Sequence, residues 1–198
     1  MTVTSDDTEE QDRTIPPLRT LRFDRPTELY TEIPEISGFT KHRPNDDEDP
    51  LGFFERLRAS TTPEDAITYT AFATEPQVAI GWGVEAIRVT LPDLPPDELQ
   101  LMSWISQWLD HPSSENRWRT MQVALFAPRR SATVYLGLAV GWSGGALAPN
   151  DPVAVPDWRS PKAVNAAILR ALGQLGLEQR SVSLARVLDL AAGLFRVY

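Results

Sequence analysis

The chain has 198 residues, which suits one ordinary domain with an appendage. Its net charge of -8 argues against nonspecific binding to nucleic acid or to anionic lipid, and the lack of cysteine excludes disulfides and thiolate sites. No uninterrupted apolar segment is long enough to span a membrane, and the acidic N-terminus does not resemble a secretory signal. We therefore expect a cytoplasmic protein.

Acidic residues are concentrated near the N-terminus. Residues 1–50 hold 13 acidic and 6 basic side chains, whereas the rest of the chain holds 14 and 13. Residues 1–19 are polar and bury too little apolar surface to offset chain entropy. We divide the chain into an acidic arm, residues 1–48, expected to be largely extended or disordered, and a helical domain, residues 49–198.

Residues 20–40 are more apolar than a linker, but Pro26 and Pro34 interrupt them too often for a helix. We expect this segment either to pack in extended form on its own domain or to dock on a partner protein. The candidate partner-binding residues are Phe23, Leu29, Tyr30, Ile33, Ile36 and Phe39.

From residue 49 onward the chain carries repeated helix start signals. Asp49 precedes a proline, and Thr62-Pro63-Glu64-Asp65 has the form of a capping box. Thr74-Glu75-Pro76 repeats the start signal. The residues that follow have helical spacing up to Leu91, although the alternation from Val78 to Val84 suits a strand equally well.

The second half of the chain continues the helical pattern. Two adjacent apolar stripes between residues 99 and 109 predict a helix packed on two neighbours. Residues 131–143 are small and apolar, which predicts a central buried helix that Gly144-Gly145 terminates. Residues 148–159 are a proline-rich surface loop, and Ser160-Pro161 caps the next helix. We predict an all-α fold, a compact bundle or array of about eight short helices with an extended acidic N-terminal tail.

Gly141, Ser143 and Gly145 match the G-x-S-x-G pattern of serine hydrolases. That chemistry needs a strand before the serine and a later histidine as base, whereas His42 and His111 both precede Ser143. We therefore interpret Trp142-Ser143-Gly144-Gly145 as a structural turn at a helix end. Two histidines without cysteine do not predict a metal site, and no cofactor is expected.

Four strings occur in a fixed order: Asp65-Ala66-Ile67, Ala79-Ile80-Gly81-Trp82, Trp108 to Arg117, and Trp142 to Pro149. The series resembles a bacterial domain-of-unknown-function family of small helical proteins, whose members show a "W-x-x-DPSEENR" turn and an "FWSGGSLAP" turn. The likeness covers about residues 50–175. It implies an all-helical fold and no established activity. Its members resemble neighbours of type VI secretion components, which implies an accessory or adaptor role.

The leading functional prediction is a non-catalytic interaction or adaptor protein, not an enzyme, whose partner is another protein. Trp158 adds a further candidate contact, because tryptophan is a frequent anchor in interfaces. Two alternatives stay open: an immunity-like inhibitory protein that uses its acidic tail, and a serine hydrolase that uses Ser143.

Overall fold

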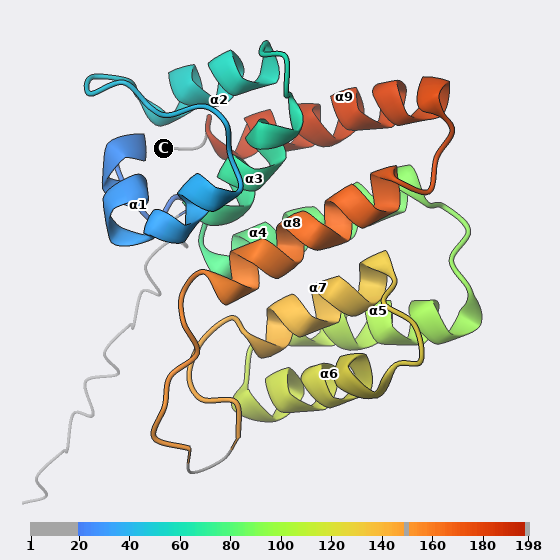
Figure 1. Ribbon diagram of the computed structural model, residues 1–198. Helices are drawn as coiled ribbons and strands as arrows, with labels where there is room; N and C mark the ends of the chain where they lie inside the picture. The colour runs from blue at the N-terminus through green and yellow to red at the C-terminus, as the bar shows by residue number, and fades with distance from the viewer. Residues whose placement is uncertain (1–19, 149–150, 197–198) are drawn as a thin grey trace, which may run out of the picture.

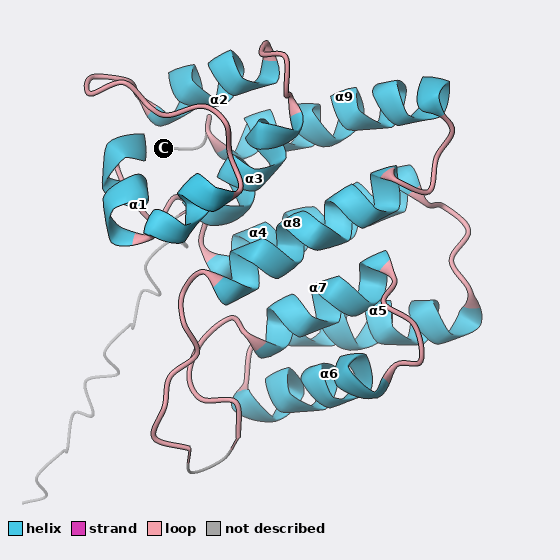
Figure 2. Cartoon of the chain, viewed as in Figure 1, coloured by secondary structure: helices cyan, strands magenta, loops and turns pink. Residues whose placement is uncertain are grey.

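The computed structural model describes residues 20–148 and 151–196 (Figure 1). Its elements are α1 (Pro26–Glu32), the 3-10 helix η1 (Pro34–Gly38), α2 (Pro50–Arg58), α3 (Glu64–Ala73), α4 (Pro76–Thr90), α5 (Pro96–Asp110), α6 (Ser114–Phe126), α7 (Ala132–Gly141), α8 (Arg159–Leu172) and α9 (Leu177–Leu194). Within these residues, the β-type backbone pairing consists of two isolated bridges. The all-α prediction is confirmed (Figure 2).

The helices form a stacked array around one apolar core (Figure 1). Helix α7 packs against α6 and α8, and α8 packs on α3 and α4. Helix α5 closes the array beside α6 and α7, while α9 covers α4 and the start of the domain. None of the helices in the described segments is both long and apolar enough to cross a bilayer.

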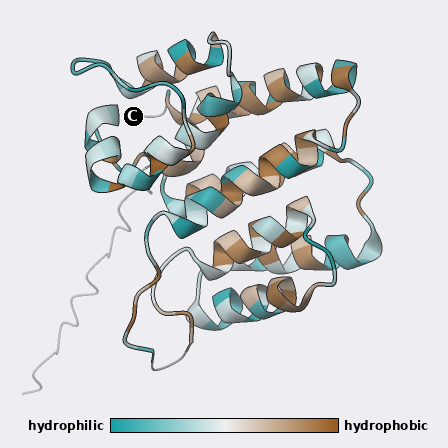
Figure 3. Ribbon diagram, in the orientation of Figure 1, coloured by the Kyte–Doolittle hydropathy of each residue, from teal (hydrophilic) through white to brown (hydrophobic). Residues whose placement is uncertain are grey.

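Helix α7 is the central element that residues 131–143 predict. The Ser131 side chain accepts a hydrogen bond from the Val134 N–H and caps its start. Nearly all of its residues are buried, and in Figure 3 brown, apolar stretches alternate with pale ones along it. A Cβ at Gly141 would lie only 2.4 Å from Met121 Cγ, so glycine allows α6 and α7 to cross closely.

The segment from Val78 to Val84 is helical, which decides between the two sequence interpretations. It belongs to α4, where Ile80, Trp82 and Val84 are all buried. Neighbours lie on several sides of this helix, because α4 contacts α7, α8 and α9. Burial on several sides removes the single apolar stripe and leaves an alternation that imitates a strand.

The structure corrects the expectation that the arm is extended between residues 20 and 40. Pro26 begins α1 and Pro34 begins η1, at positions where the missing N–H of proline costs no intrahelical bond. The arm also joins the domain through its backbone. Arg22 N–H donates to the Ala73 carbonyl at 2.8 Å, and Glu75 N–H donates to the Thr20 carbonyl at 3.0 Å.

Two predicted start signals work differently from the prediction. Thr62 does not cap α3, and its hydroxyl oxygen is buried without a hydrogen-bond partner. Ser160 lies inside the first turn of α8, where its buried hydroxyl donates to the Ala139 carbonyl of α7 at 2.9 Å. At Ser160 a tertiary hydrogen bond thus replaces the local cap that the sequence suggests, whereas α3 begins without a side-chain cap.

Candidate interaction site

Two predicted partner-binding residues meet at the start of α8. Phe39 follows η1, and Trp158 immediately precedes α8. The Lys162 ammonium lies 5.0 Å from the centre of the Phe39 ring and 5.2 Å from the centre of the Trp158 indole, so both rings flank one cation. The Arg159 guanidinium lies 5.8 Å from the same indole. We name Phe39, Trp158, Arg159 and Lys162 the aromatic corner.

Helix geometry and the arm together hold the aromatic corner in place. Lys162 is one turn after Trp158, a spacing that puts both side chains on the same face. The Phe39 ring packs against Phe72, with 6.2 Å between ring centres, and Phe39 stays 37 % exposed. Trp158 is half-buried against the core. Both rings are therefore anchored to the core and still partly open to solvent.

An ion pair beside Trp158 links the arm to the proline-rich loop. The Arg22 guanidinium lies 3.2 Å from the Asp157 carboxylate and 5.7 Å from the centre of the Phe23 ring. Over the described residues, neither Arg159 nor Lys162 has a carboxylate partner within ion-pair distance. The aromatic corner thus combines two aromatic rings with two positive charges that no acidic group of the described chain neutralises.

The other predicted docking residues are used inside the molecule. Leu29, Ile33 and Ile36 are at most 4 % exposed and belong to the core, so in this fold they are inaccessible to a partner. Phe23 and Tyr30 are half-buried and pack against that core. Of the predicted set, Phe39 and Trp158 are brought together, and the three aliphatic residues attach the arm to the domain.

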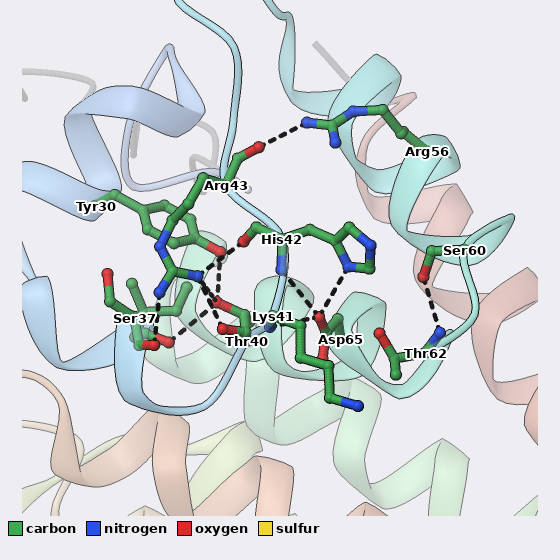
Figure 4. Close-up of polar contacts among 11 residues, drawn as sticks. Tyr30, Ser37, Thr40, Lys41, His42, Arg43, Arg56, Ser60, Thr62 and Asp65 are labelled. Carbon is green, nitrogen blue, oxygen red and sulfur yellow. Dashed lines mark hydrogen bonds and ion pairs between the residues drawn. The ribbon is translucent and has the colours of Figure 1, made fainter.

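A polar cluster fixes the turn after Phe39 (Figure 4). Asp65, in the first turn of α3, is only 6 % exposed. Its Oδ2 accepts the Lys41 N–H at 2.7 Å and the His42 N–H at 3.3 Å, and it lies 3.2 Å from His42 Nδ1. Asp65 therefore satisfies two backbone donors of the arm from within the domain.

Arg43 and Tyr30 complete this cluster on the side of η1. Arg43 donates to the carbonyls of Thr40 and Ser37, each at 2.8 Å, and the Tyr30 hydroxyl lies 2.9 Å from Thr40 Oγ1 (Figure 4). Burial raises the pKa of the Tyr30 phenol, which keeps it protonated. These hydrogen bonds join the turn after η1 to α1 and hold the arm in place.

Arg56 extends the same attachment to the loop before α2. Its guanidinium donates to both carboxylate oxygens of Glu48, at 2.7 and 2.6 Å, and to the Arg43 carbonyl at 2.8 Å. The hydrogen bonds from Arg56 lower the pKa of the Glu48 carboxyl. This bidentate pair ties residues 43–48 to α2.

The turns that carry the resemblance touch each other through Arg117. This side chain is 7 % exposed and donates to the Gly141 carbonyl at 2.8 Å and to the Ala146 carbonyl at 2.9 Å. Gly145 adopts a φ of 63°, in the left-handed region that glycine favours. Burial lowers the pKa of the Arg117 guanidinium, which nevertheless remains charged at neutral pH. Arg117 thus caps the C-terminus of α7 and shapes the turn after it.

Ser143 does not have the surroundings of a nucleophile. It follows helix α7 instead of a strand, and its hydroxyl donates to the Val140 carbonyl at 2.8 Å. His42 pairs with Asp65, and neither histidine hydrogen-bonds the Ser143 hydroxyl in the described chain. The geometry does not fit the hydrolase alternative. The same described segments hold no group of three potential metal ligands.

The immunity-like alternative depends on the acidic tail, and residues 1–19 lie outside the described residues. It therefore stays a prediction.

A comparison with known protein families assigns the chain to one of them. The sequence pattern of a family of unknown function (DUF6931) matches residues 53–195. The chain belongs to this family. A comparison with curated proteins found no match, and a comparison with solved structures found none. The match begins within α2, so the arm that supplies Phe39 lies outside it, whereas Trp158 and Lys162 lie within it.

Sequence reasoning missed three residues of this region. In the sequence, nothing distinguishes Lys162 from an ordinary surface lysine. Its position between two rings depends on the fold of the arm. Asp65 looks like a helix-start acid, although it is buried against residues 41 and 42. Arg117 carried a signal, since it ends the first of the two motif turns, but only the structure shows that it contacts the second.

Proposed function

We propose that this member of the DUF6931 family is a non-catalytic interaction protein, an adaptor or accessory of a bacterial multiprotein system, and that a partner protein docks on the aromatic corner. The observation that carries the proposal is the joint position of Phe39 and Trp158 around Lys162. Aromatic anchors on a fixed scaffold lose little conformational entropy on binding, and tryptophan is enriched among hot spots of interfaces.

The charges of the corner support one kind of partner. Arg159 and Lys162 favour an acidic partner surface, since like charges across an interface are repelled. The two rings favour apolar side chains at its centre. We propose a partner that presents apolar residues with acidic residues around them. We further propose that this partner is a secretion component or effector, in keeping with the type VI secretion link that the resemblance implies, and that the two proteins meet in the cytoplasm.

Affinity purification of the tagged full-length chain from bacteria that express it, with quantitative mass spectrometry, tests this proposal. Trp158→Ala and Phe39→Ala should each reduce recovery of the same co-purifying protein. Loss of an aromatic hot spot costs about 2 kcal/mol, which corresponds to roughly a 30-fold weaker Kd.

Leu177→Ala is the matched control, because Leu177 is 84 % exposed at the start of α9 and has no part in the corner. This variant should recover the partner like the unchanged chain. Recovery that is the same for Trp158→Ala, Phe39→Ala and Leu177→Ala would remove the aromatic corner from the proposal.

A further inference from the structure

A groove of about 560 Å³ lies at the other end of α8 from the aromatic corner. It opens where the start of α5, the end of α6, the start of α7 and the end of α8 come together. Helix α8 has 14 residues, so its two ends are about 20 Å apart. The groove is therefore a separate surface of the molecule.

One wall of the groove is apolar and open to solvent. Phe126, the last residue of α6, is 86 % exposed, and Val123, one turn earlier on the same face, is 41 % exposed. Leu101 and Val134 also line the groove and are buried. Single exposed apolar residues are common, but a neighbouring pair that borders a concave surface with an apolar floor is typical of a binding surface.

The chain that leaves α6 is fixed beside this wall. Arg130 donates to the Ala124 carbonyl at 3.0 Å and to the Leu125 carbonyl at 3.3 Å, which are among the last carbonyls of the helix. These bonds hold residues 127–131 in position and leave the Phe126 ring outside the core. The groove is consequently formed before any partner arrives, which lowers the entropy cost of binding.

The groove is lined by more basic than acidic side chains. Arg129 and Arg130 come from the loop before α7, and Arg170 comes from α8. Within the described ranges, none of these three has a carboxylate at ion-pair distance. Two acids line the groove on the α5 side, Asp97 and Glu98. Glu98 accepts a hydrogen bond from Thr133 Oγ1 at 2.8 Å. The lining carries three positive and two negative side chains, in a chain whose net charge is -8.

We propose that this groove binds a short acidic segment of a partner protein that inserts an apolar side chain beside Phe126. Its volume suits a few side chains of a segment. The arginines select carboxylates, and the overall negative charge of the chain disfavours nucleic acid as the occupant. The inference adds a second docking surface to the proposed interaction protein, so that one chain has the means to bridge two partners.

Fluorescence anisotropy with two labelled 12-residue peptides tests the proposal on the full-length chain. One peptide alternates Asp-Asp with Leu-Phe, and the other has lysine in place of aspartate. We expect saturable binding of the acidic peptide only, weakened by added salt. Arg129→Glu with Arg170→Glu should weaken binding about tenfold, and Phe126→Ser by a similar factor.

Matched controls are available on α9. Arg186→Glu changes an exposed arginine outside the groove, and Leu177→Ser changes an equally exposed apolar residue; both should bind like the unchanged chain. Trp158→Ala should also leave peptide binding intact, which separates this proposal from the aromatic corner. Equal binding of both peptides, or equal losses in the groove and control variants, would overturn it.

Two other occupants would also overturn the proposal. Peptide binding that appears only after the five acids between residues 6 and 12 are changed to their amides would assign the groove to the chain's own N-terminus. A concentration-dependent dimer in analytical ultracentrifugation that Phe126→Ser abolishes would assign it to a second copy of the chain.

Discussion

At the scale of single residues, the stability of the motif turns depends on a buried charge. The buried Arg117 guanidinium donates to two backbone carbonyls instead of to water. One belongs to Gly141 at the end of α7, and the other to Ala146 after the glycine pair. A planar guanidinium reaches two acceptors at once, whereas a lysine ammonium is a compact point charge. Without this side chain the Gly141 carbonyl, which is buried, loses its donor.

Arg117→Lys should therefore lower the free energy of unfolding by about 1–3 kcal/mol, the usual cost of a buried polar group left without a partner. Arg119→Lys is the control, because Arg119 forms an exposed i,i+4 pair with Glu115 and such pairs contribute little. Urea denaturation followed by circular dichroism measures both. Equal midpoints for the two variants would show that Arg117 does not hold the turns.

At the scale of elements, close helix crossings decide how the array packs. Gly141 lies at the contact between α6 and α7, where a Cβ would overlap Met121, whereas Gly81 lies on α4 with no neighbouring atom within 4 Å of its ideal Cβ. Both glycines are helical, so an alanine improves helix propensity at either place by roughly the same amount, about 1 kcal/mol. Their packing separates them.

Gly141→Ala should destabilise the chain by up to about 2 kcal/mol net, because overpacking typically costs about 1–3 kcal/mol and the gain in helix propensity offsets about 1 kcal/mol. Gly81→Ala should instead stabilise it by about 0.5–1 kcal/mol. Thermal unfolding of the two variants side by side measures the difference in sign. A stabilised Gly141→Ala variant would mean that α6 shifts away from α7 at little cost.

For the molecule as a whole, the described part of the arm, residues 20–48, and the family domain form one body. Residues before the family match supply Leu29 and Ile36 to the same core that α3 and α8 complete. The polar contacts of Asp65 and Arg56 add a second attachment between arm and domain. We expect the arm and the helices to unfold together.

Leu29→Ala tests this, because Leu29 is 1 % exposed and such a deletion costs about 2–5 kcal/mol. All six tryptophans lie after residue 49, so their fluorescence reports on the domain alone. We expect the tryptophan transition in urea to move to lower concentration. An unchanged transition would show that the arm detaches independently of the helices. Phe126→Ala is the control, because Phe126 is exposed and its loss should leave the transition in place.

The amino-acid sequence alone predicts the helical class, about eight helices after residue 49 and the central position of α7, and the described chain has eight helices there. These features depend on proline positions, capping residues and apolar spacing, which act within a few residues. It did not determine the arm, because Pro26 and Pro34 read equally as breaks and as first-turn positions.

Which apolar side chains stay exposed depends on the fold. Phe39 and Ile36 are both apolar residues of one segment, yet one borders Lys162 at the surface and the other is fully buried. The positions of Asp65, Arg117 and Lys162 likewise depend on contacts with residues far away in the sequence. Asp65 accepts from Lys41, Arg117 donates to Gly141, and Lys162 lies over the Phe39 ring. Burial and long-range contacts arise from how helices pack, and a local pattern does not encode them uniquely.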